Sequence, residues 1–435
     1  MAKKRQVKVD VITMGCSKNL VDSEFLIKQF QTGGFKVEHD PEVSKGDIVI
    51  INTCGFIGDA KEESVETILQ FAEARKAGKI DQLIVMGCLS ERYFGELKTE
   101  LPEVDKFYGK FEWKKIVEDL GLEFRPDLRN ERSLTTPDHY AYLKISEGCN
   151  RACSYCAIPL ITGKHQSRSI EDLIDETQNL VAKGVKEIQV IAQDLSYYGI
   201  DLYKKPMLAE LIQQLSAING LEWIRLHYAY PAGFPLDVLK VIAQHINVCC
   251  YMDIALQHIS DNMLTKMRRG VTKQQTYDLI ESMRREVPGI HLRTTLIAGH
   301  PGETEADFDE LKQFVQDMKF ERLGVFAYSH EEDTYAFKNY NDDVTDEIKQ
   351  ARVDELMELQ NVISRELNQQ KIGQTYKVII DREEDGYFVG RTEFDSPEVD
   401  QEVIVNSDNL TIGEFYQVKI TESDDYDLIG VAITY

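Results

Sequence analysis

The sequence lacks the marks of membrane and exported proteins. None of its apolar runs approaches the ~18 residues that a membrane-spanning helix needs, so we expect no membrane partner. The N-terminal stretch MAKKRQVKVDVITMGC is basic, but no apolar region with a small-residue cleavage site follows it, and we predict no signal peptide. We therefore expect a cytoplasmic protein, in which cysteines are metal ligands, catalytic thiols or core residues more often than disulfides.

Basic charge is also scarce. The 435 residues include 50 Lys and Arg against 74 Asp and Glu, which gives a net charge of −24. A broad nucleic-acid-binding surface would need the opposite balance. The charge suits a basic partner, although an acidic surface that only favours solubility is the commoner explanation.

Residues 5–123 alternate between strand-like and helix-like runs. The runs VKVDVITMG, DIVIINT and QLIVMG are short, apolar and rich in β-branched residues, and helical stretches such as KEESVETILQFAEARKAG follow them. Strands that alternate with helices indicate a parallel sheet with crossover helices, so we predict a doubly wound α/β domain. The polar, proline-bearing stretch at 124–139 is typical of a linker.

Residues 140–365 alternate in the same way. They contain six strand candidates, which are AYLKIS, EIQVIA, WIRLHY, CYMDIAL, HLRTTLIA and LGVFAY. Six strand–helix units are too few for a complete TIM barrel, so we predict a partial, open barrel with its chemistry at the C-terminal strand ends. A long charged helix, roughly 345–370, leads into 368–435, where five short strands predict a small all-β barrel of the oligonucleotide-binding kind.

The run EGCNRACSYC places Cys149, Cys153 and Cys156 directly after the first strand of the central segment. Three thiolates at this spacing can hold three corners of a 4Fe-4S cluster and leave the fourth iron without a protein ligand. Zinc is the main alternative, but zinc sites favour paired CxxC elements with a fourth Cys or His. The pattern therefore predicts an iron–sulfur cluster with one open iron.

This motif on a partial barrel resembles the radical S-adenosylmethionine (SAM) superfamily. The resemblance implies that the amino and carboxylate groups of SAM chelate the open iron. One-electron reduction would then release a 5′-deoxyadenosyl radical. Tyr155 matches the aromatic residue usual before the third cysteine, and the resemblance places it in the cofactor site; packing beneath the loop is the alternative.

The stretch IAGHPGETE follows a strand candidate with a glycine turn and is expected to open a helix at Glu303. Gly299 and Gly302 would let the backbone approach a ligand, and the helix N-terminus would offer free N–H groups. A purely structural turn is an equal alternative. By resemblance to the superfamily, this stretch contacts the adenosyl moiety of SAM.

Two other strand ends carry polar residues. IAQDLSYYG places Gln193 and Asp194 where related enzymes hold the methionyl amino group, and we predict Gln193 as a cofactor-binding residue. IALQHISD places Gln257 and His258 at another strand end. For a single histidine such as His258, a hydrogen-bonded role in the core is the better interpretation.

Three cysteines of the first segment occupy equivalent positions. Cys16, Cys54 and Cys88 each follow a strand candidate, in VITMGC, VIINTC and LIVMGC, and lie 38 and 34 residues apart. The C-terminal ends of parallel strands share one edge of a sheet, so the three thiols should converge there. The alternative is three buried core thiols, which is the better interpretation for the adjacent Cys249 and Cys250 of VCCYMDIAL.

Two three-cysteine sites and a C-terminal small barrel together resemble the methylthiotransferase family over essentially the whole chain. The resemblance implies a radical SAM core, a C-terminal TRAM domain and a second, auxiliary 4Fe-4S cluster on Cys16, Cys54 and Cys88. The auxiliary cluster would present the sulfur of a methylthio group, and a second SAM would supply the methyl group. The electron would come from a reductase or a flavodoxin-type donor. No general acid or base is assigned.

Local motifs favour one branch of that family. GCSKNLVDSE and NTCGFIGDAKEES resemble the enzyme that modifies an aspartate of ribosomal protein S-twelve, whereas the transfer-RNA enzymes usually carry GCQMN and NTCSIR there. Residues 372–435 hold fifteen acidic residues against four basic ones, a net charge of −11. A barrel that grips RNA needs a positive groove, so we expect no direct RNA grip by the TRAM domain and a basic protein as the partner.

The expected reaction is therefore methylthiolation of the β-carbon of an aspartate in ribosomal protein S-twelve. Because that carbon is not acidic, the hydrogen must be removed by a radical. Two alternatives stay open. The same chemistry could act on adenosine in transfer RNA, or the chain could be an electron-transfer or scaffold protein that only holds iron–sulfur clusters.

Overall fold

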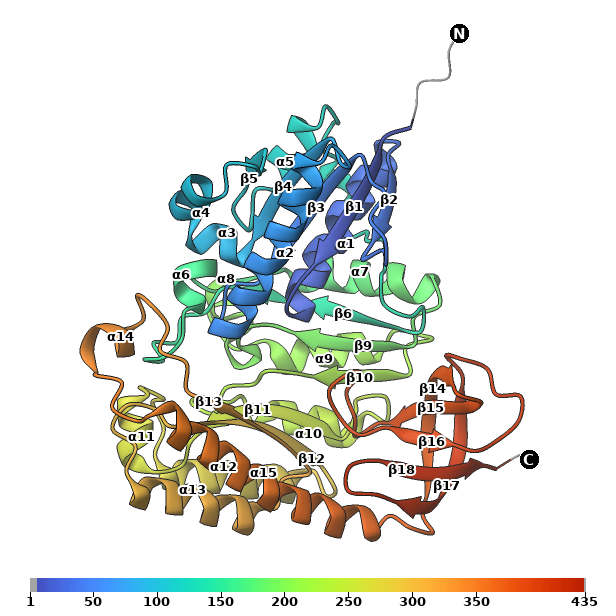
Figure 1. Ribbon diagram of the computed structural model, residues 1–435. Helices are drawn as coiled ribbons and strands as arrows, with labels where there is room; N and C mark the ends of the chain where they lie inside the picture. The colour runs from blue at the N-terminus through green and yellow to red at the C-terminus, as the bar shows by residue number, and fades with distance from the viewer. Residues whose placement is uncertain (1–5, 434–435) are drawn as a thin grey trace.

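A five-stranded parallel sheet forms the first domain in the computed structural model, which describes residues 6–433 (Figure 1). Residue 5, where we placed the start of this domain, and residues 434–435 at the end of the third lie outside that range. The strand order is β2 (Lys36–His39), β1 (Lys8–Thr13), β3 (Ile48–Thr53), β4 (Gln82–Gly87) and β5 (Lys106–Phe107). The helices are α1 (Ser17–Thr32), α2 (Gly58–Lys76), α3 (Cys88–Arg92), α4 (Phe94–Glu100) and α5 (Trp113–Asp119).

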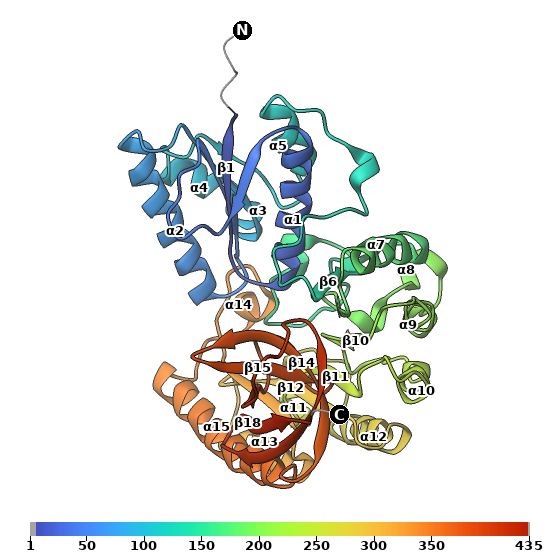
Figure 2. The same ribbon diagram turned by 90° about the vertical axis from the view of Figure 1, so that its right-hand side faces the viewer.

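Helices cover both faces of this sheet (Figure 2). Side chains alternate along β3, so Ile48 and Ile50 pack in one core with residues of α1 and α5. Val49 and Ile51 pack in a second core with Ile68 of α2. The predicted doubly wound parallel sheet is therefore confirmed. The edge strands β2 and β5 were not predicted, because they are short and lack an apolar run.

Six parallel strands form the central domain as two three-stranded sheets. One has the order β10 (Trp223–Leu226), β9 (Glu187–Ile191) and β6 (Tyr140–Lys144), and the other has β11 (Tyr251–Gln257), β12 (His291–Ala298) and β13 (Arg322–Ala327). Isolated bridges, such as the one between Ala229 and Ile254, join the two sheets. Because β6 and β13 lie at opposite edges, the barrel is open between them, as predicted.

Six longer helices pack on the outside of these strands and complete the strand–helix units. They are α7 (Ile170–Ala182), α9 (Leu208–Ser216), α10 (Asp237–Gln244), α12 (Lys273–Glu286), α13 (Glu305–Met318) and α15 (Asp346–Gln369). Short elements decorate the strand ends, namely η1 (Pro126–Leu128), β7 (Ser146–Glu147), α6 (Ile158–Thr162), β8 (Gln166–Ser167), η2 (Leu195–Tyr197), α8 (Ile200–Tyr203), α11 (Asp261–Lys266) and α14 (Tyr335–Asn339). None of the helices within residues 6–433 is long and apolar enough to cross a membrane.

The third domain is a closed five-stranded barrel, as predicted. Its strands run in the order β14 (Thr375–Glu384), β15 (Tyr387–Thr392), β16 (Val403–Val405), β18 (Leu428–Ala432) and β17 (Phe415–Ser423), and β17 pairs with β14 to close it. Alternating residues such as Val378 and Ile380 fill its interior. Helix α15, which leads into this barrel, ends at Gln369, inside the stretch that we assigned to the third domain.

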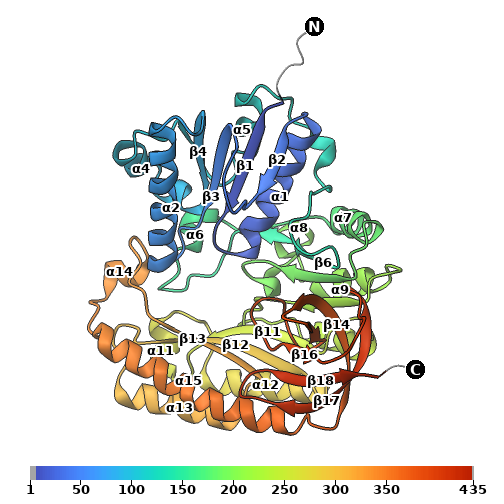
Figure 3. The same cartoon turned by 45° about the vertical axis from the view of Figure 1, so that its right-hand side comes forward.

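The segment 124–139, predicted as a linker, is anchored by one buried arginine. Arg132 is fully buried; it donates to Glu24 of α1 and, over 2.8 Å, to Glu176 of α7. This pair of contacts ties the first domain to the central one. The third domain contacts the N-terminal ends of the barrel strands, for example at Glu187 of β9 and Tyr251 of β11 (Figure 3).

Candidate active site

Three free thiols lie in the loop between β7 and α6, and we call Cys149, Cys153 and Cys156 the loop site. The backbone N–H of Arg151 donates to Cys149 Sγ (3.4 Å). Arg269 Nη1 donates to Cys153 Sγ (3.3 Å). The loop follows β6 and β7 at the C-terminal edge of the barrel, and its sulfur atoms accept hydrogen bonds from its own backbone and from Arg269, which follows α11.

The electrostatics of the loop site fit a bound metal cluster. Burial raises the pKa of the Cys149 thiol to about 11, and it also raises the pKa of Cys156. Neighbouring thiolates raise both further, because like charges repel. A cationic cluster would offset that cost, since metal ligation requires the deprotonated sulfur. The three thiols thus fit a cluster held by three cysteines.

Tyr155, between Cys153 and Cys156, is half-buried. Its hydroxyl accepts a hydrogen bond from Arg269 Nη1 (3.0 Å), and burial raises its pKa well above the ordinary value. The same guanidinium lies 4.1 Å from the centre of the Tyr230 ring. Sequence reasoning missed Arg269 and Tyr230, because nothing in MRRG or HYAYP marks them as part of a site. A direct contact of Tyr155 with SAM stays a prediction.

Several buried polar atoms at or near the C-terminal strand ends have no hydrogen-bond partner among the described residues. They include Oε1 of Gln193, Oε1 of Gln257 and Nε of Arg269. Gln193 uses its amide nitrogen to donate to Glu147 Oε2 (2.9 Å), which leaves the oxygen free. Gln257 has a φ of +73°, a strained backbone that a non-glycine residue seldom adopts. Because buried polar atoms are nearly always paired, these atoms indicate a polar ligand.

The glycine turn has a different packing from the one expected. Helix α13 begins at Glu305 with Thr304 as its N-cap, two residues later than the predicted start at Glu303. Gly299 and Gly302 have φ values of +81° and +76°, so both need glycine for the turn. A Cβ added at Gly299 would lie 2.3 Å from the Lys349 side chain, and a Cβ added at Gly302 would lie 1.8 Å from Lys266 Nζ.

Glu303 turns back onto its own loop. It accepts from the N–H of Gly299 (2.7 Å) and from Arg352 Nη1 (3.0 Å). Burial raises its pKa to about 7, despite these donors. His258 Nε2 lies 3.7 Å from the same carboxylate, and burial lowers the pKa of His258 to about 3. Contacts from Gly299, Gly302 and Glu303 to SAM stay predictions.

The sheet of the first domain brings its three predicted cysteines together, and we call Cys16, Cys54 and Cys88 the edge site. Cys16 is the N-cap of α1, Cys54 follows β3, and Cys88 begins α3. A Cβ at Gly15, where φ is +86°, would lie 2.6 Å from Cys54 Cβ. A Cβ at Gly55 would meet the backbone of Cys88 at 2.9 Å. The two glycines thus let the turns approach one another.

The edge site is flanked by two lysines. The Cys16 residue is exposed, yet desolvation of its sulfur acts to raise the pKa. The ammonium groups of Lys18 and Lys110, together with backbone N–H groups of Asn19 and Lys18, outweigh that effect, and the net pKa is lowered. Lys110 Nζ lies 3.8 Å from Cys88 Sγ, yet burial prevails there and raises the pKa of Cys88 to about 12. Both ammonium groups favour anionic sulfur at this edge.

Within residues 6–433, no three His, Cys, Asp or Glu side chains have the arrangement that would hold a single metal ion. A four-iron cluster takes one iron for each thiolate, so its ligands need not converge on one point. The residues of the edge site fit such a group by their thiol chemistry and by their common position at the sheet edge. That they hold a cluster stays a prediction.

A buried polar chain links the edge site to the loop side of the barrel. Lys110 Nζ contacts Asp22 Oδ2 (3.3 Å), Asp22 pairs with Lys144 of β6, and Lys144 pairs with Glu147. Glu147 in turn accepts from Gln193. At the other edge of the barrel, Glu331 pairs with first-domain lysine and arginine side chains. The first domain therefore covers the C-terminal strand ends from both edges of the barrel.

Known families match all three domains. The Radical SAM superfamily matches residues 143–315, the uncharacterized protein family UPF0004 matches residues 8–109, and the TRAM domain matches residues 372–433. The partial barrel with its loop site is thus the core of a radical SAM protein. Among solved structures, the radical SAM methyltransferase TsrM from Kitasatospora setae has a TM-score of 0.55 at 15% identity and covers 74% of this chain and 73% of that chain. That likeness concerns the fold alone.

Curated relatives match the chain over nearly its whole length. It is 62% identical to the ribosomal protein uS12 methylthiotransferase RimO of Bacteroides fragilis, over 98% of this chain and 99% of that protein. It is 53% identical to the protein of the same name from Flavobacterium johnsoniae, over 97% of each. The chain belongs to the ribosomal protein uS12 methylthiotransferase family. The family that the cysteine motifs predicted is therefore confirmed.

Proposed function

We propose that this protein is a radical SAM methylthiotransferase that modifies the β-carbon of an aspartate in ribosomal protein uS12. The observation that carries the proposal is the 62% identity to a uS12 methylthiotransferase over 98% of the chain. The two cysteine sites on facing ends of neighbouring domains support the same reaction, because a carbon radical must be trapped close to where it forms. Transfer RNA is not favoured as the substrate.

When bound, a 4Fe-4S cluster on the loop site would supply the electron that releases a radical from SAM, and a second cluster on the edge site would supply sulfur. Arg269 holds both Cys153 and Tyr155, and so fixes the orientation of the loop. The free oxygens of Gln193 and Gln257 suit a donor such as the methionyl amino group of SAM. No residue is assigned as a general acid or base.

The interface between the first domain and the central barrel also keeps water away from the radical. The buried chain of Asp22, Lys110 and Lys144 packs the first domain against the strand ends. Closed, dry sites prevent the quenching of reactive intermediates. The electron that starts the reaction would come from a reductase or a flavodoxin-type protein.

The acidic third domain supports a protein substrate over RNA. Its net charge of −11 repels phosphate and attracts a basic ribosomal protein. We propose that the TRAM domain does not bind RNA directly in this protein. This choice also separates the proposal from the alternative reaction on transfer-RNA adenosine.

The direct test is mass spectrometry of uS12 from cells with and without this gene. A methylthio group on an aspartate that disappears with the gene would support the proposal. Loss of methylthio-adenosine from transfer RNA instead would overturn the substrate. A reconstituted protein that makes no 5′-deoxyadenosine with reductant and SAM would leave only an electron-transfer or scaffold role.

A further inference from the structure

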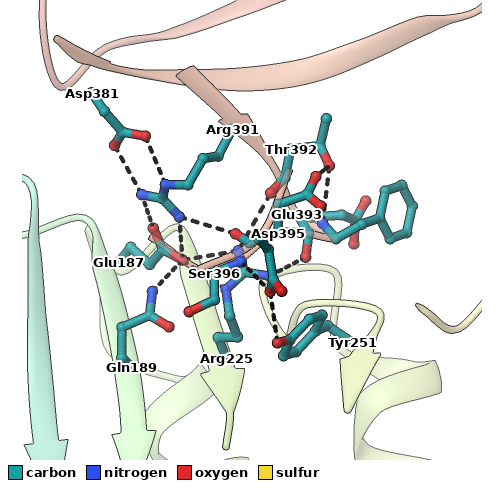
Figure 4. Close-up of polar contacts among 12 residues, drawn as sticks. Glu187, Gln189, Arg225, Tyr251, Asp381, Arg391, Thr392, Glu393, Asp395 and Ser396 are labelled. Carbon is teal, nitrogen blue, oxygen red and sulfur yellow. Dashed lines mark hydrogen bonds and ion pairs between the residues drawn. The ribbon is translucent and has the colours of Figure 1, made fainter. Parts of the chain in front are cut away.

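One segment of the third domain covers the end of the central barrel at which its strands begin. We call residues 393–402, between β15 and β16, the plug segment. Just before it, Arg391 of β15 reaches between Asp381 and Glu187, the first residue of β9 (Figure 4). Arg225 of β10 donates to the backbone carbonyl of Glu393 at the start of the segment. The segment thus lies across the N-terminal strand ends, opposite the cysteine sites.

Each of the six barrel strands contacts β15 or the plug segment through a named polar pair. The pairs are Tyr140 with Glu398 (3.0 Å), Glu187 with Arg391 (2.8 Å), Arg225 with Glu393, Tyr251 with Asp400 (2.8 Å), Arg293 with Asp400 (3.1 Å) and Arg322 with Asp395 (3.0 Å). The plug segment is therefore held in one position relative to both open edges, β6 and β13.

Beside the plug segment, at the β13 edge, lies a cavity of about 460 Å³ that we call the acidic recess. It is formed by β13, α15, the plug segment and the turn between β17 and β18. Its carboxylates are Glu321, Glu398, Asp400, Glu402 and Asp427. The two arginines in its wall are already engaged, since Arg293 pairs with Asp400 and Arg322 with Asp395. Glu402 also pairs with Arg382, which lies outside the lining (2.6 Å). Five carboxylates against two arginines still give the lining an excess of negative charge.

Two carboxylates of the recess are poorly solvated. Glu321 accepts from the N–H of Leu292 (2.9 Å) and lies 3.6 Å from Arg284, and Asp427 accepts from the N–H of Glu402 (2.8 Å). Burial nevertheless raises the pKa of both. Gln360 of α15 is 2% exposed and lines the same cavity. Its amide nitrogen donates to the Phe320 carbonyl (2.9 Å), but its oxygen has no partner among the described residues. A buried acceptor without a donor indicates a missing hydrogen-bond donor.

The rim of the recess is strained and accessible. Glu398 has a φ of +70°, a conformation that costs energy for a residue other than glycine. Val399, the next residue, is 60% exposed. Strain of this kind is kept where a segment must present its side chains in one arrangement.

We propose that the acidic recess binds a lysine or arginine side chain of the uS12 substrate and so anchors a basic segment of that protein along the open β13 edge. The inference rests on the proposed function and adds where the substrate docks. A cationic donor would satisfy the Gln360 oxygen and the carboxylates of Glu321 and Asp427 together. The segment would then run along the open side of the barrel toward the cysteine sites at the far strand ends.

The first test uses the full-length reconstituted enzyme and purified uS12. The double variant Glu321→Gln and Asp427→Asn removes two charges while keeping both acceptors. We expect the Kd and the KM for uS12 to rise roughly tenfold while kcat changes little, because charge-assisted hydrogen bonds are lost in substrate binding. The matched control is Asp408→Asn with Glu422→Gln, which removes two exposed charges of the same domain outside the recess.

The second test does not depend on the stability of the recess variants. A photo-cross-linking residue, Val399→p-benzoylphenylalanine, should capture a uS12 peptide that contains Lys or Arg, whereas the same residue at the exposed Ile412 should not. If the wild-type enzyme modifies uS12 but the recess variant has the same Kd and KM for uS12 as the wild type, the docking proposal is wrong and the proposed function stands. If the wild type neither binds nor modifies uS12, both proposals fail.

Discussion

The ammonium nitrogen of Lys18 lies 3.6 Å from the centre of the Tyr228 ring. Lys18 is in the first turn of α1, two residues after Cys16, and Tyr228 follows β10 with a φ of +66°. The contact therefore joins the edge site of the first domain directly to the strand ends of the barrel. Together with the Asp22–Lys144 pair, it holds the edge site against the barrel.

Replacing Lys18 should uncouple the two halves of the reaction. In Lys18→Met we expect 5′-deoxyadenosine to form as before, while the yield of methylthiolated uS12 per 5′-deoxyadenosine falls roughly threefold to tenfold, as the loss of a cation–π contact implies. Mass spectrometry of both products gives this ratio. Lys205→Met, at an exposed lysine of the central domain, is the control. An unchanged ratio in Lys18→Met would show that this contact does not set the geometry.

The two cysteine sites should separate in iron content and in activity. Cys88→Ala should lower the iron from about eight to about four per chain, since each cluster holds four irons, and should abolish methylthiolation while 5′-deoxyadenosine still forms. Cys153→Ala should remove the other cluster and all 5′-deoxyadenosine. Cys250→Ala, which is in no predicted site, should keep the full iron content. If Cys88→Ala and the wild type contained the same amount of iron, the prediction of an auxiliary cluster on Cys16, Cys54 and Cys88 would be wrong.

Arg132 should be worth several kcal/mol of stability. Arg132→Met leaves the buried carboxylates of Glu24 and Glu176 without their shared cation, which costs roughly 3–5 kcal/mol. Urea unfolding of the protein should show a clearly lower midpoint. Arg129→Met is the matched control, because Arg129 is 71% exposed and its pair with Asp172 is a surface salt bridge. Similar midpoints for the two variants would contradict the anchoring role of Arg132.

Docking of the third domain should weaken in acid. Burial would raise the pKa of Asp381, but Arg391 and the hydrogen bond from His139 hold it at about 2, below the ordinary 3.8. A lowered carboxyl pKa stabilises the folded state above pH 4 and loses that contribution as the pH falls toward 2. Asp381→Asn should thus cost about 2 kcal/mol at pH 7, and its difference from the wild type should shrink in acid.

Trp223 offers the readout for that experiment. It packs edge-on against Phe415 of β17, with ring centres 4.8 Å apart, so its fluorescence reports contact between the barrel and the third domain. The sequence has one other tryptophan, Trp113, and a Trp113→Phe background isolates the signal. Asp408→Asn serves as the exposed control. If the difference in unfolding free energy between the wild type and Asp381→Asn stayed constant from pH 7 to pH 3, the lowered pKa of Asp381 would be contradicted.

Much of the fold was predictable because it depends on local patterns. The strands β1, β3 and β4 are apolar, β-branched runs followed by turns, and the six barrel strands alternate with amphipathic stretches. The structure places each of them within a few residues of its prediction. The edge strands β2 and β5 were missed, since they have no such run. The glycine turn was located correctly, but its side-chain neighbours Lys349 and Lys266 come from distant helices that no local pattern reveals.

The amino-acid sequence by itself determined the chemistry: which thiols are available, that they come in two sets of three, and that the third domain is acidic. Those properties belong to residue types and to spacing along the chain. Only the tertiary structure decided which groups complete each site, as with Arg269 beside Cys153, Lys110 beside Cys88 and Gln360 in the acidic recess. The reason is physical, because burial and charge pairing depend on neighbours that are remote in sequence and meet only when the domains pack.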